Sequence, residues 1–210
     1  SPAIAANSQQ AFAMAGKTIE DIDLIDIYSC FPSAVEVACD ALGLSYSDPR
    51  GLTLTGGLPF FGGPGNNYSM HAIATAIPLL RADPQQYALI TANGGRLSKH
   101  ATGIYSATPL RGEWQRESNA KIQTQINAMP SPEFIEAPNG VANIETYTVC
   151  FDKTNPVSGI VIGRLLETDQ RFIANTASDE STLRKMMQDD FLASSGTVFS
   201  SGGLNTFTVA

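Results

Sequence analysis

The hydrophobic period of this chain changes after Pro109, and that change limits its fold more than any other feature. Before it, residues 3–16, 33–44 and 70–83 have helical periodicity, while residues 23–29, 51–57 and 87–95 are typical of strands. Such alternation predicts an α/β layer. The apolar runs in the first and third strands predict interior strands that are covered on both faces.

After the change, short segments rich in β-branched and aromatic residues follow one another, with turn residues between them. We expect strands over 142–151, 157–166, 170–177, 196–202 and 205–210, and one amphipathic helix over 181–193. The sequence therefore predicts an α/β domain over 1–112, a connector with one short helix over 113–139, and a small, mostly antiparallel β domain over 140–210.

Composition supports folding and excludes several classes of partner. Hydrophobic residues make up 43% of the chain, charged residues make up 16%, and the formal net charge is −7. This balance argues against disorder and against non-specific binding to nucleic acid or an anionic membrane. We find no membrane-length apolar run and no signal peptide, so we expect a cytoplasmic protein.

The three cysteines, Cys30, Cys39 and Cys150, form neither an even disulfide set nor a metal-binding pair. We interpret them as reduced, and Cys30 and Cys39 as small buried hydrophobes. The two histidines have no acidic neighbours at ligand spacing, so we predict no metal site.

The most informative segments each follow a predicted strand: YSCFPSAV at 28–35, GGLPFFGGPGNNYSMHAIA at 56–74, and ANGGRLSKHATGIYS at 92–106. Open α/β sheets bind ligands at strand ends, so we predict one site assembled from these three loops. Its expected catalytic residues are Tyr28, His71, Asn93 and His100.

The second loop is rich in glycine, which suits positive φ and close backbone approach. Asn66, Asn67 and Ser69 are candidate caps for the next helix, whose free amides would favour an anion or an oxyanion. The alternative is a tight turn with ordinary capping. The expected binding residues are Gly56, Gly57, Gly62, Gly63, Asn66, Asn67, Gly94 and Gly95, with Gly65 supplying further freedom.

His71 falls in the first turn of that helix, where the helix dipole favours a neutral ring that can donate or accept a proton. The alternative is a core histidine on an apolar helix face. We expect His100 to be a loop histidine, because it lies in the polar segment SKHATG.

These motifs resemble the C-terminal half of the thiolase superfamily. YSCFPSAV, GGLPFFGGP and TANGG are similar to the loops of sterol-carrier-protein thiolases, and most similar to those of bacterial type 1 thiolase-like proteins. The resemblance covers residues 1–109, and the β-rich remainder resembles the additional C-terminal domain of the type 1 proteins. It implies a layered mixed sheet with helices, followed by that β domain.

The resemblance also implies which catalytic groups are replaced. Tyr28 stands where the family has an asparagine or histidine that helps to hold the oxyanion-hole water. Gly62-Gly63-Pro64 stands in place of Gly-His-Pro, and Ala92-Asn93-Gly94 in place of Cys-x-Gly. The half that carries the nucleophilic cysteine is absent, so we expect the chain to be a C-terminal piece of a longer protein.

Three functions are compatible with this resemblance. The first is acyl transfer or altered C–C chemistry on coenzyme A thioesters in lipid metabolism, and the second is retro-aldol cleavage of a β-hydroxyacyl thioester with a tyrosine base. The third is acyl-CoA binding without catalysis. Each implies a coenzyme A thioester as ligand, no covalent cofactor, the N-terminal thiolase half as partner, and a homodimer when intact.

The β domain allows two interpretations: a small barrel that packs against the thiolase body, or a docking surface or lid. Arg164 and Arg171 are its candidate anion contacts, with an ion-paired arginine as the alternative.

Overall fold

The computed structural model describes residues 1–110, 112, 113 and 115–210. The chain divides into two compact units, 1–129 and 130–210, and each is described by itself.

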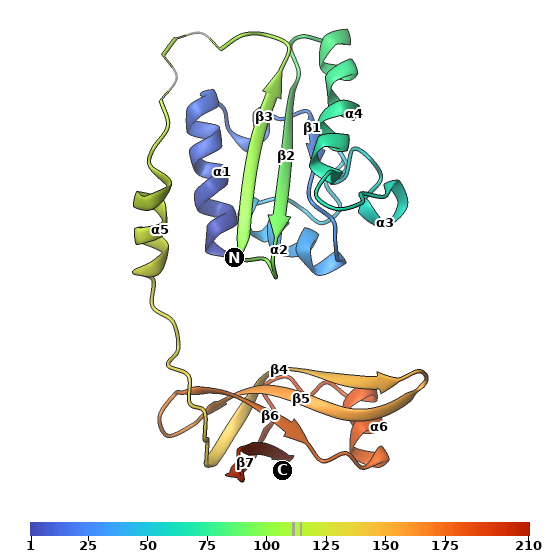
Figure 1. The fold of residues 1–210 in the computed structure, drawn as a ribbon, viewed down its shortest axis with the longest axis vertical. Helices are drawn as coiled ribbons and strands as arrows, with labels where there is room; N and C mark the ends of the chain where they lie inside the picture. Colours follow the sequence, from blue (N-terminus) through green and yellow to red (C-terminus); the bar gives the residue numbers. More distant parts are fainter. Residues whose placement is uncertain (111, 114) are drawn as a thin grey trace. The chain divides into compact units, whose positions relative to one another are not determined.

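The first unit is a three-stranded sheet with helices on both faces (Figure 1). Its elements, in chain order, are α1 (Pro2–Ala15), a short 3₁₀ turn (Ile19–Asp21), β1 (Leu24–Asp26), α2 (Pro32–Leu42), α3 (Leu58–Phe61), α4 (Tyr68–Ala82), β2 (Tyr87–Gly94), β3 (Lys99–Ser106) and α5 (Asn119–Asn127). β1 pairs with β2 in parallel, and β2 pairs with β3 antiparallel.

Two apolar clusters hold this sheet between its helices. On one face, Ile4 of α1 and Cys39 of α2 pack with Ile25 and Leu89 of the sheet. On the other face, alanines of α4 pack against Ala88 and Ile90 of β2. The middle of β2 is buried on both faces, which explains its continuous apolar run.

Two sequence predictions in this unit are wrong. Residues 51–57 form no strand; they make one isolated bridge, from Thr53 to Asp26, before the chain turns at Gly56 and Gly57, both at positive φ. Conversely, residues 99–106 form strand β3, so His100 lies in a strand and not in a loop. This edge strand is only partly buried and mixes polar residues with glycine, so it has no apolar run to reveal it.

The second unit is a closed barrel of five strands with one helix. Its elements are β4 (Gly140–Asp152), β5 (Asn155–Leu165), β6 (Arg171–Thr176), α6 (Glu180–Gln188), β7 (Ser195–Ser201) and β8 (Leu204–Val209). The strand order is β4-β5-β6-β8-β7, and only the β6–β8 pair is parallel. This order, with the helix between the third and fourth strands, is that of an OB-fold barrel.

The barrel core follows from alternation along each strand. In β5, Gly159, Val161, Gly163 and Leu165 are buried, while the residues between them are partly exposed. Val161, Leu165 and Phe172 pack with Phe207 of β8 and Met186 of α6 in one apolar cluster. Inward glycines leave room for the rings: a Cβ at Gly163 would lie 2.5 Å from Phe172 Cζ.

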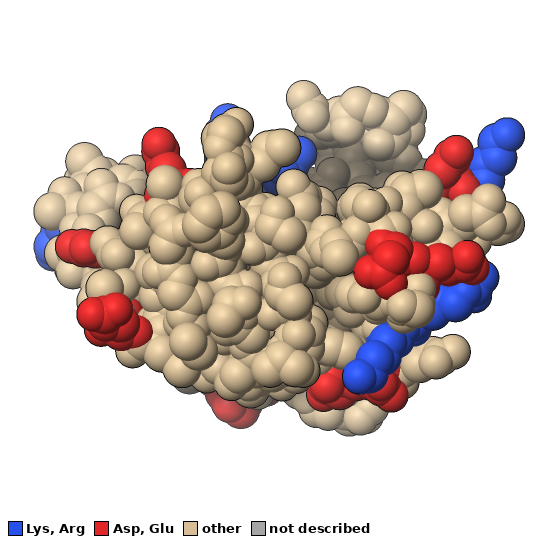
Figure 2. Space-filling view, turned by 90° about the horizontal axis from the view of Figure 1, so that it is seen from below, with Lys and Arg blue, Asp and Glu red and all other residues tan. Residues whose placement is uncertain are grey.

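Charge is unevenly distributed over the protein surface. No Asp, Glu, Lys or Arg occurs from Phe191 to Ala210, the segment that contains β7 and β8. The face in Figure 2 has a broad uncharged middle, with charged side chains at its margin. Many OB-fold barrels bind oligonucleotides on their second and third strands, here β5 and β6, but the arginines of these strands, Arg164 and Arg171, are both paired with Glu145. The barrel topology alone therefore does not argue for nucleic-acid binding.

We expect Gly163→Ala to lower the free energy of unfolding of the second unit by about 1–3 kcal/mol. The new methyl group would meet the Phe172 ring and, at 2.9 Å, the Asn143 carbonyl oxygen, which belongs to the backbone and does not rotate away. Hydrogen-exchange protection of β5 amides measures the loss. Asn175→Ala, on the exposed side of β6, is the matched control and should change stability by less than about 0.5 kcal/mol. Equal effects of the two variants would contradict this packing argument.

Candidate functional site

The site residues from the first and third loops meet at one edge of the sheet. β1 and β2 run parallel, so their carboxyl ends lie side by side. The Tyr28 backbone N–H donates to Thr91 Oγ1 at 2.9 Å, and Asn93 Nδ2 donates to Cys30 Sγ at 3.4 Å. The loop after β1 is thus bonded to the end of β2.

Tyr28, Asn93 and His100 line one small hollow at this edge, together with Thr91, Ala92 and residues of α1 and α2. Its volume is about 10 Å³, which is room for a single water molecule at most. The Asn93 Oδ1 atom is buried without a hydrogen-bond partner, and His100 Nε2 lies 2.9 Å from the Leu97 carbonyl oxygen. The structure therefore brings together three of the four expected catalytic residues.

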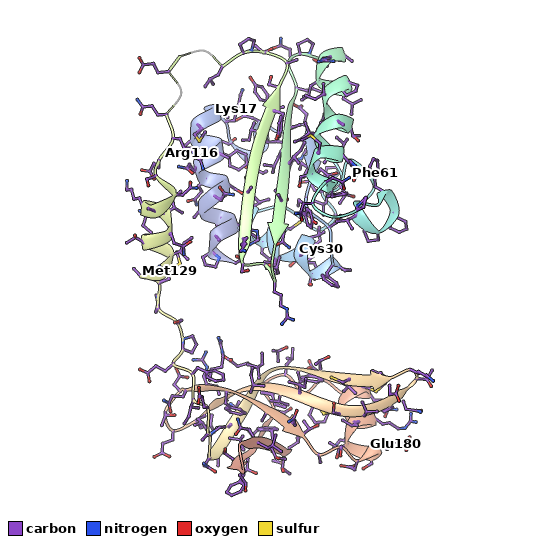
Figure 3. The ribbon with its side chains drawn as sticks, viewed as in Figure 1. Lys17, Cys30, Phe61, Arg116, Met129 and Glu180 are labelled. Atoms are coloured by element: carbon purple, nitrogen blue, oxygen red, sulfur yellow. The ribbon has the colours of Figure 1, made fainter. Side chains whose placement is uncertain are left out.

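His71 is not among the residues that line this hollow. It lies in the first turn of α4, where its ring packs against Phe61 with centroids 5.4 Å apart. Its Nδ1 atom is buried without a hydrogen-bond partner. Figure 3 shows Phe61, the last residue of α3, close to α4, and Cys30 in the loop before α2.

The glycine-rich loop folds around the short helix α3. Gly57 and Gly62 flank this helix with φ values of 98° and 81°, which disfavour side chains with a Cβ. Gly63 has a different constraint: a Cβ there would lie 2.8 Å from Tyr68 Cβ. The glycines thus serve two purposes, backbone conformation and close packing on Tyr68.

The start of α4 is capped differently from the prediction. Asn67 occupies the cap position, but its side chain makes no capping bond, and its Oδ1 atom is buried without a partner. Asn66 is exposed, and the Ser69 hydroxyl donates to the Thr91 carbonyl oxygen at 3.3 Å. Gly94 ends β2, and Gly95, with φ of 65°, begins the turn to β3.

A buried hydrogen-bond network lies beneath these loops, and sequence reasoning missed it. Asp26, fully buried, accepts from the Thr55 backbone N–H and Thr55 Oγ1 at 3.0 Å each. Tyr68, also buried, lies with its hydroxyl 2.6 Å from Thr55 Oγ1, and its ring meets Tyr28 edge to face. Ser29 Oγ accepts from the Leu58 N–H at 2.8 Å. An acidic residue inside the apolar run DLIDI was the available signal.

Burial determines the direction of the pKa shifts in this network. Desolvation raises the pKa of Asp26 and outweighs its hydrogen bonds to Thr55, which act in the opposite direction. Desolvation also raises the pKa of Tyr68 and of the Cys39 thiol. The Asp26 Oδ1 atom has no partner, which adds to the cost of a charge at this position.

The remaining candidate groups lie elsewhere. All three cysteines are free. Arg164 and Arg171 both bind Glu145, with Arg164 Nη2 2.7 Å from Glu145 Oε1 and Arg171 Nε 2.5 Å from Glu145 Oε2. The described residues contain no group of three or more His, Cys, Asp and Glu that could hold a metal ion.

Comparisons with known proteins found similar proteins for both units of the chain. Residues 121–203 match the family described as thiolase-like protein type 1 additional C-terminal domain. The fold matches the crystal structure of a monomeric SCP2-thiolase like protein type 1 from Mycobacterium smegmatis, with a TM-score of 0.89 and 44% sequence identity. The chain is thiolase-like and carries the type 1 additional C-terminal domain. A search of curated protein sequences found no match.

The match covers 100% of this thiolase-like chain and 46% of the solved protein, so the chain spans less than half of that protein's length. The predicted thiolase-like α/β fold followed by a β domain is confirmed. The solved protein is described as monomeric, which gives the expected homodimer no support. Of the helices that the structure describes, none combines the length and apolarity that crossing a membrane requires.

We expect Asp26→Asn to change the pH dependence of stability in a defined direction. Because the folded-state pKa of Asp26 is raised, its contribution to stability is fully present below the unfolded pKa near 4 and is lost as pH rises through the folded pKa. The stability of the natural chain relative to Asp26→Asn should therefore fall as pH rises through this window. Hydrogen-exchange protection of α4 and β2 amides, followed over this pH range in both proteins, measures the difference in stability.

Glu36→Gln, an exposed position on α2, controls for the loss of one surface charge. A stability difference between the natural chain and Asp26→Asn that stays constant or grows with pH would contradict the burial argument for Asp26.

Proposed function

We propose that the protein containing this chain binds coenzyme A thioesters without ordinary thiolase turnover. Thiolase chemistry needs a base to form a thiolate or carbanion, and donors to hold the thioester oxygen. The resemblance places that base at Gly63 and a second acid/base group at Ala92. Neither residue has a side chain that carries a proton.

The observation that carries this proposal is the close packing at Gly63. A Cβ at this position would lie 2.8 Å from Tyr68 Cβ and 3.3 Å from Tyr68 Cα. Tyr68 is buried, and its hydroxyl is bonded to Thr55, so the ring has little freedom to move aside. The position that the resemblance assigns to the histidine is therefore blocked by Tyr68, and Gly63 itself has no side chain that could transfer a proton.

The position of His71 gives little support for the idea that this histidine acts as a substitute base. Its ring packs against Phe61, outside the hollow that Tyr28, Asn93 and His100 line. The retro-aldolase alternative needs room for a hydroxyacyl group beside Tyr28, whereas the hollow there measures about 10 Å³. Both observations count against these two reactions. The coenzyme A ligand and the protein's own N-terminal thiolase half as partner are parts of this proposal.

We expect the intact protein to bind acetyl-CoA in a calorimetric titration but to show no CoA-dependent cleavage of acetoacetyl-CoA. Loss of an activating base or of an oxyanion donor typically costs on the order of 10²-fold or more in rate. The double variant Gly63→His/Ala92→Cys should also fail to cleave acetoacetyl-CoA, because Tyr68 closes the position of the histidine.

Robust cleavage by the natural protein that His71→Ala abolishes would show that His71 is a working base, and would overturn the proposal. Cleavage gained by the double variant would show that Tyr68 yields space at Gly63, and would remove the main support for it.

The packing at Gly63 is testable separately from activity. We expect Gly63→Ala to destabilise the first unit by about 1–3 kcal/mol, because backbone as well as side-chain atoms of Tyr68 oppose the new methyl group. Gly94→Ala is the matched control, since its Cβ would meet Lys99 Cβ at an ordinary 3.5 Å. Thermal unfolding followed by circular dichroism compares the two variants. A smaller loss for Gly63→Ala than for Gly94→Ala would contradict the argument.

A further inference from the structure

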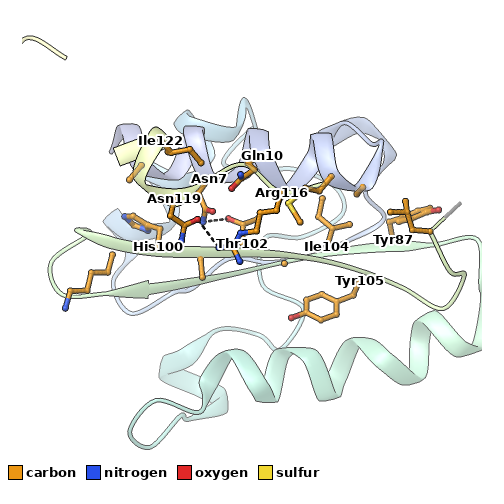
Figure 4. A pocket seen from close by; sticks show the side chains of 18 of the residues that line it. Asn7, Gln10, Tyr87, His100, Thr102, Ile104, Tyr105, Arg116, Asn119 and Ile122 are labelled. Carbon is orange, nitrogen blue, oxygen red and sulfur yellow. Dashed lines mark hydrogen bonds between the residues drawn. The ribbon is translucent and has the colours of Figure 1, made fainter. Parts of the chain in front are cut away.

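A groove of about 1010 Å³ runs between α1, β3 and α5 in the first unit (Figure 4). It follows β3 along its length, which is about 25 Å for eight strand residues. The site described above is one small hollow at the strand ends, and of the residues that the structure describes only 100–102 border both spaces. The groove plays no part in the proposed function.

One wall of the groove is apolar and incompletely packed. α5 contributes Ile122 and Ile126, α1 contributes Met14, and β3 contributes Ile104. All four side chains are only partly buried. α1 is joined to the segment just before α5 by a hydrogen bond from Gln10 Nε2 to the Glu117 carbonyl oxygen at 3.0 Å. These helices therefore leave an elongated apolar surface between them.

The charges along the groove have one sign. Among the described residues that line it there is no Asp or Glu, although the chain contains 20 acidic residues and has a net charge of −7. Two permanent cations, Lys99 and Arg116, do line it. An acid-free groove with basic side chains favours an anion.

Arg116 is the cation best placed to hold the anion. Its Nη2 atom donates to Asn119 Oδ1 at 2.9 Å, a neutral partner, and none of the ion pairs among the described residues includes it. The neighbouring carboxylate, Glu117, is paired with Lys121 at 2.7 Å. Figure 4 shows Arg116 beside Gln10 and Thr102, above β3. Several of its N–H groups are thus available to a carboxylate.

We propose that this groove binds a long-chain carboxylate, with its head group at Arg116 and its alkyl chain along Ile122 and Ile126 of α5. The groove is elongated, apolar along its helical wall and positive where Arg116 lies, which matches an anion with an extended hydrocarbon body. The free acid is the ligand class, distinct from the coenzyme A thioester of the proposed function.

Affinity should rise with chain length and depend on the head group. Over octanoate, decanoate and dodecanoate we expect the Kd to fall about twofold per added methylene, since a half-open groove buries only part of each group. Dodecanoate should bind about threefold more tightly than dodecanol, the advantage of an exposed ion pair. Titrations of the chain below the micelle concentrations, followed by amide NMR shifts, measure both effects.

The variants separate the head-group contact from the chain contact. Arg116→Gln should abolish the preference for dodecanoate over dodecanol, whereas Arg81→Gln, an exposed cation of α4 that does not line the groove, should retain it. Ile122→Ser should weaken both ligands, and unchanged circular dichroism confirms that α5 still forms. The shifted amides should belong to α1, β3 and α5, and acetyl-CoA should not displace the fatty acid.

Several outcomes would overturn the proposal: equal binding of dodecanoate and dodecanol, a preference that survives Arg116→Gln, or amide shifts confined to the loops of Tyr28 and Asn93. Concentration-dependent self-association of the chain that blocks the same amides would assign the groove to contact between copies. Failure of acetyl-CoA binding would overturn the proposed function but would not contradict the proposal that the groove binds a long-chain carboxylate.

Discussion

The buried carboxylate of Asp26 is the point on which the arrangement of the first unit depends. It accepts two hydrogen bonds from Thr55, whose hydroxyl contacts Tyr68 at the start of α4. Strand β1, the glycine-rich loop and α4 are therefore joined through one polar cluster inside an apolar unit. A buried polar group is costly unless it is bonded, so these contacts specify how the three segments fit together.

This cluster also determines what the site can do. Tyr68 is held by Thr55, its Cβ lies against Gly63, and its ring packs at a right angle to that of Tyr28. The same contacts that order the loop leave little room for a side chain at Gly63. The packing of the loops at this site therefore depends on Tyr68.

The second unit is held together differently, by closure of its sheet into a barrel. Its five strands close on themselves, so pairing leaves few exposed edges, and its inward glycines admit the rings of Phe172 and Phe207. Glu145 pairs with both Arg164 and Arg171 on the partly exposed side of the barrel. These arginines have a structural partner, so neither needs a ligand to explain its position.

The sequence by itself determined the order of nearly all helices and strands, because hydrophobic period is a local property that each segment displays on its own. It also predicted, through the resemblance of the loops, that Gly63 and Ala92 stand where the resembled family has a histidine and a cysteine. The sequence did not reveal β3, because this half-exposed edge strand has no apolar run. It also predicted a strand over residues 51–57, where the structure has one isolated bridge to β1.

Only the tertiary structure decided which of the candidate residues meet. Tyr28, Asn93 and His100 share a hollow because β1 and β2 are parallel neighbours, while His71 turns toward Phe61 because α3 packs beside α4. The burial of Asp26, the closure at Gly63 by Tyr68, and the acid-free groove beside β3 likewise arise from residues far apart in the chain. Local pattern carries no information about such contacts, since they form only when the elements pack.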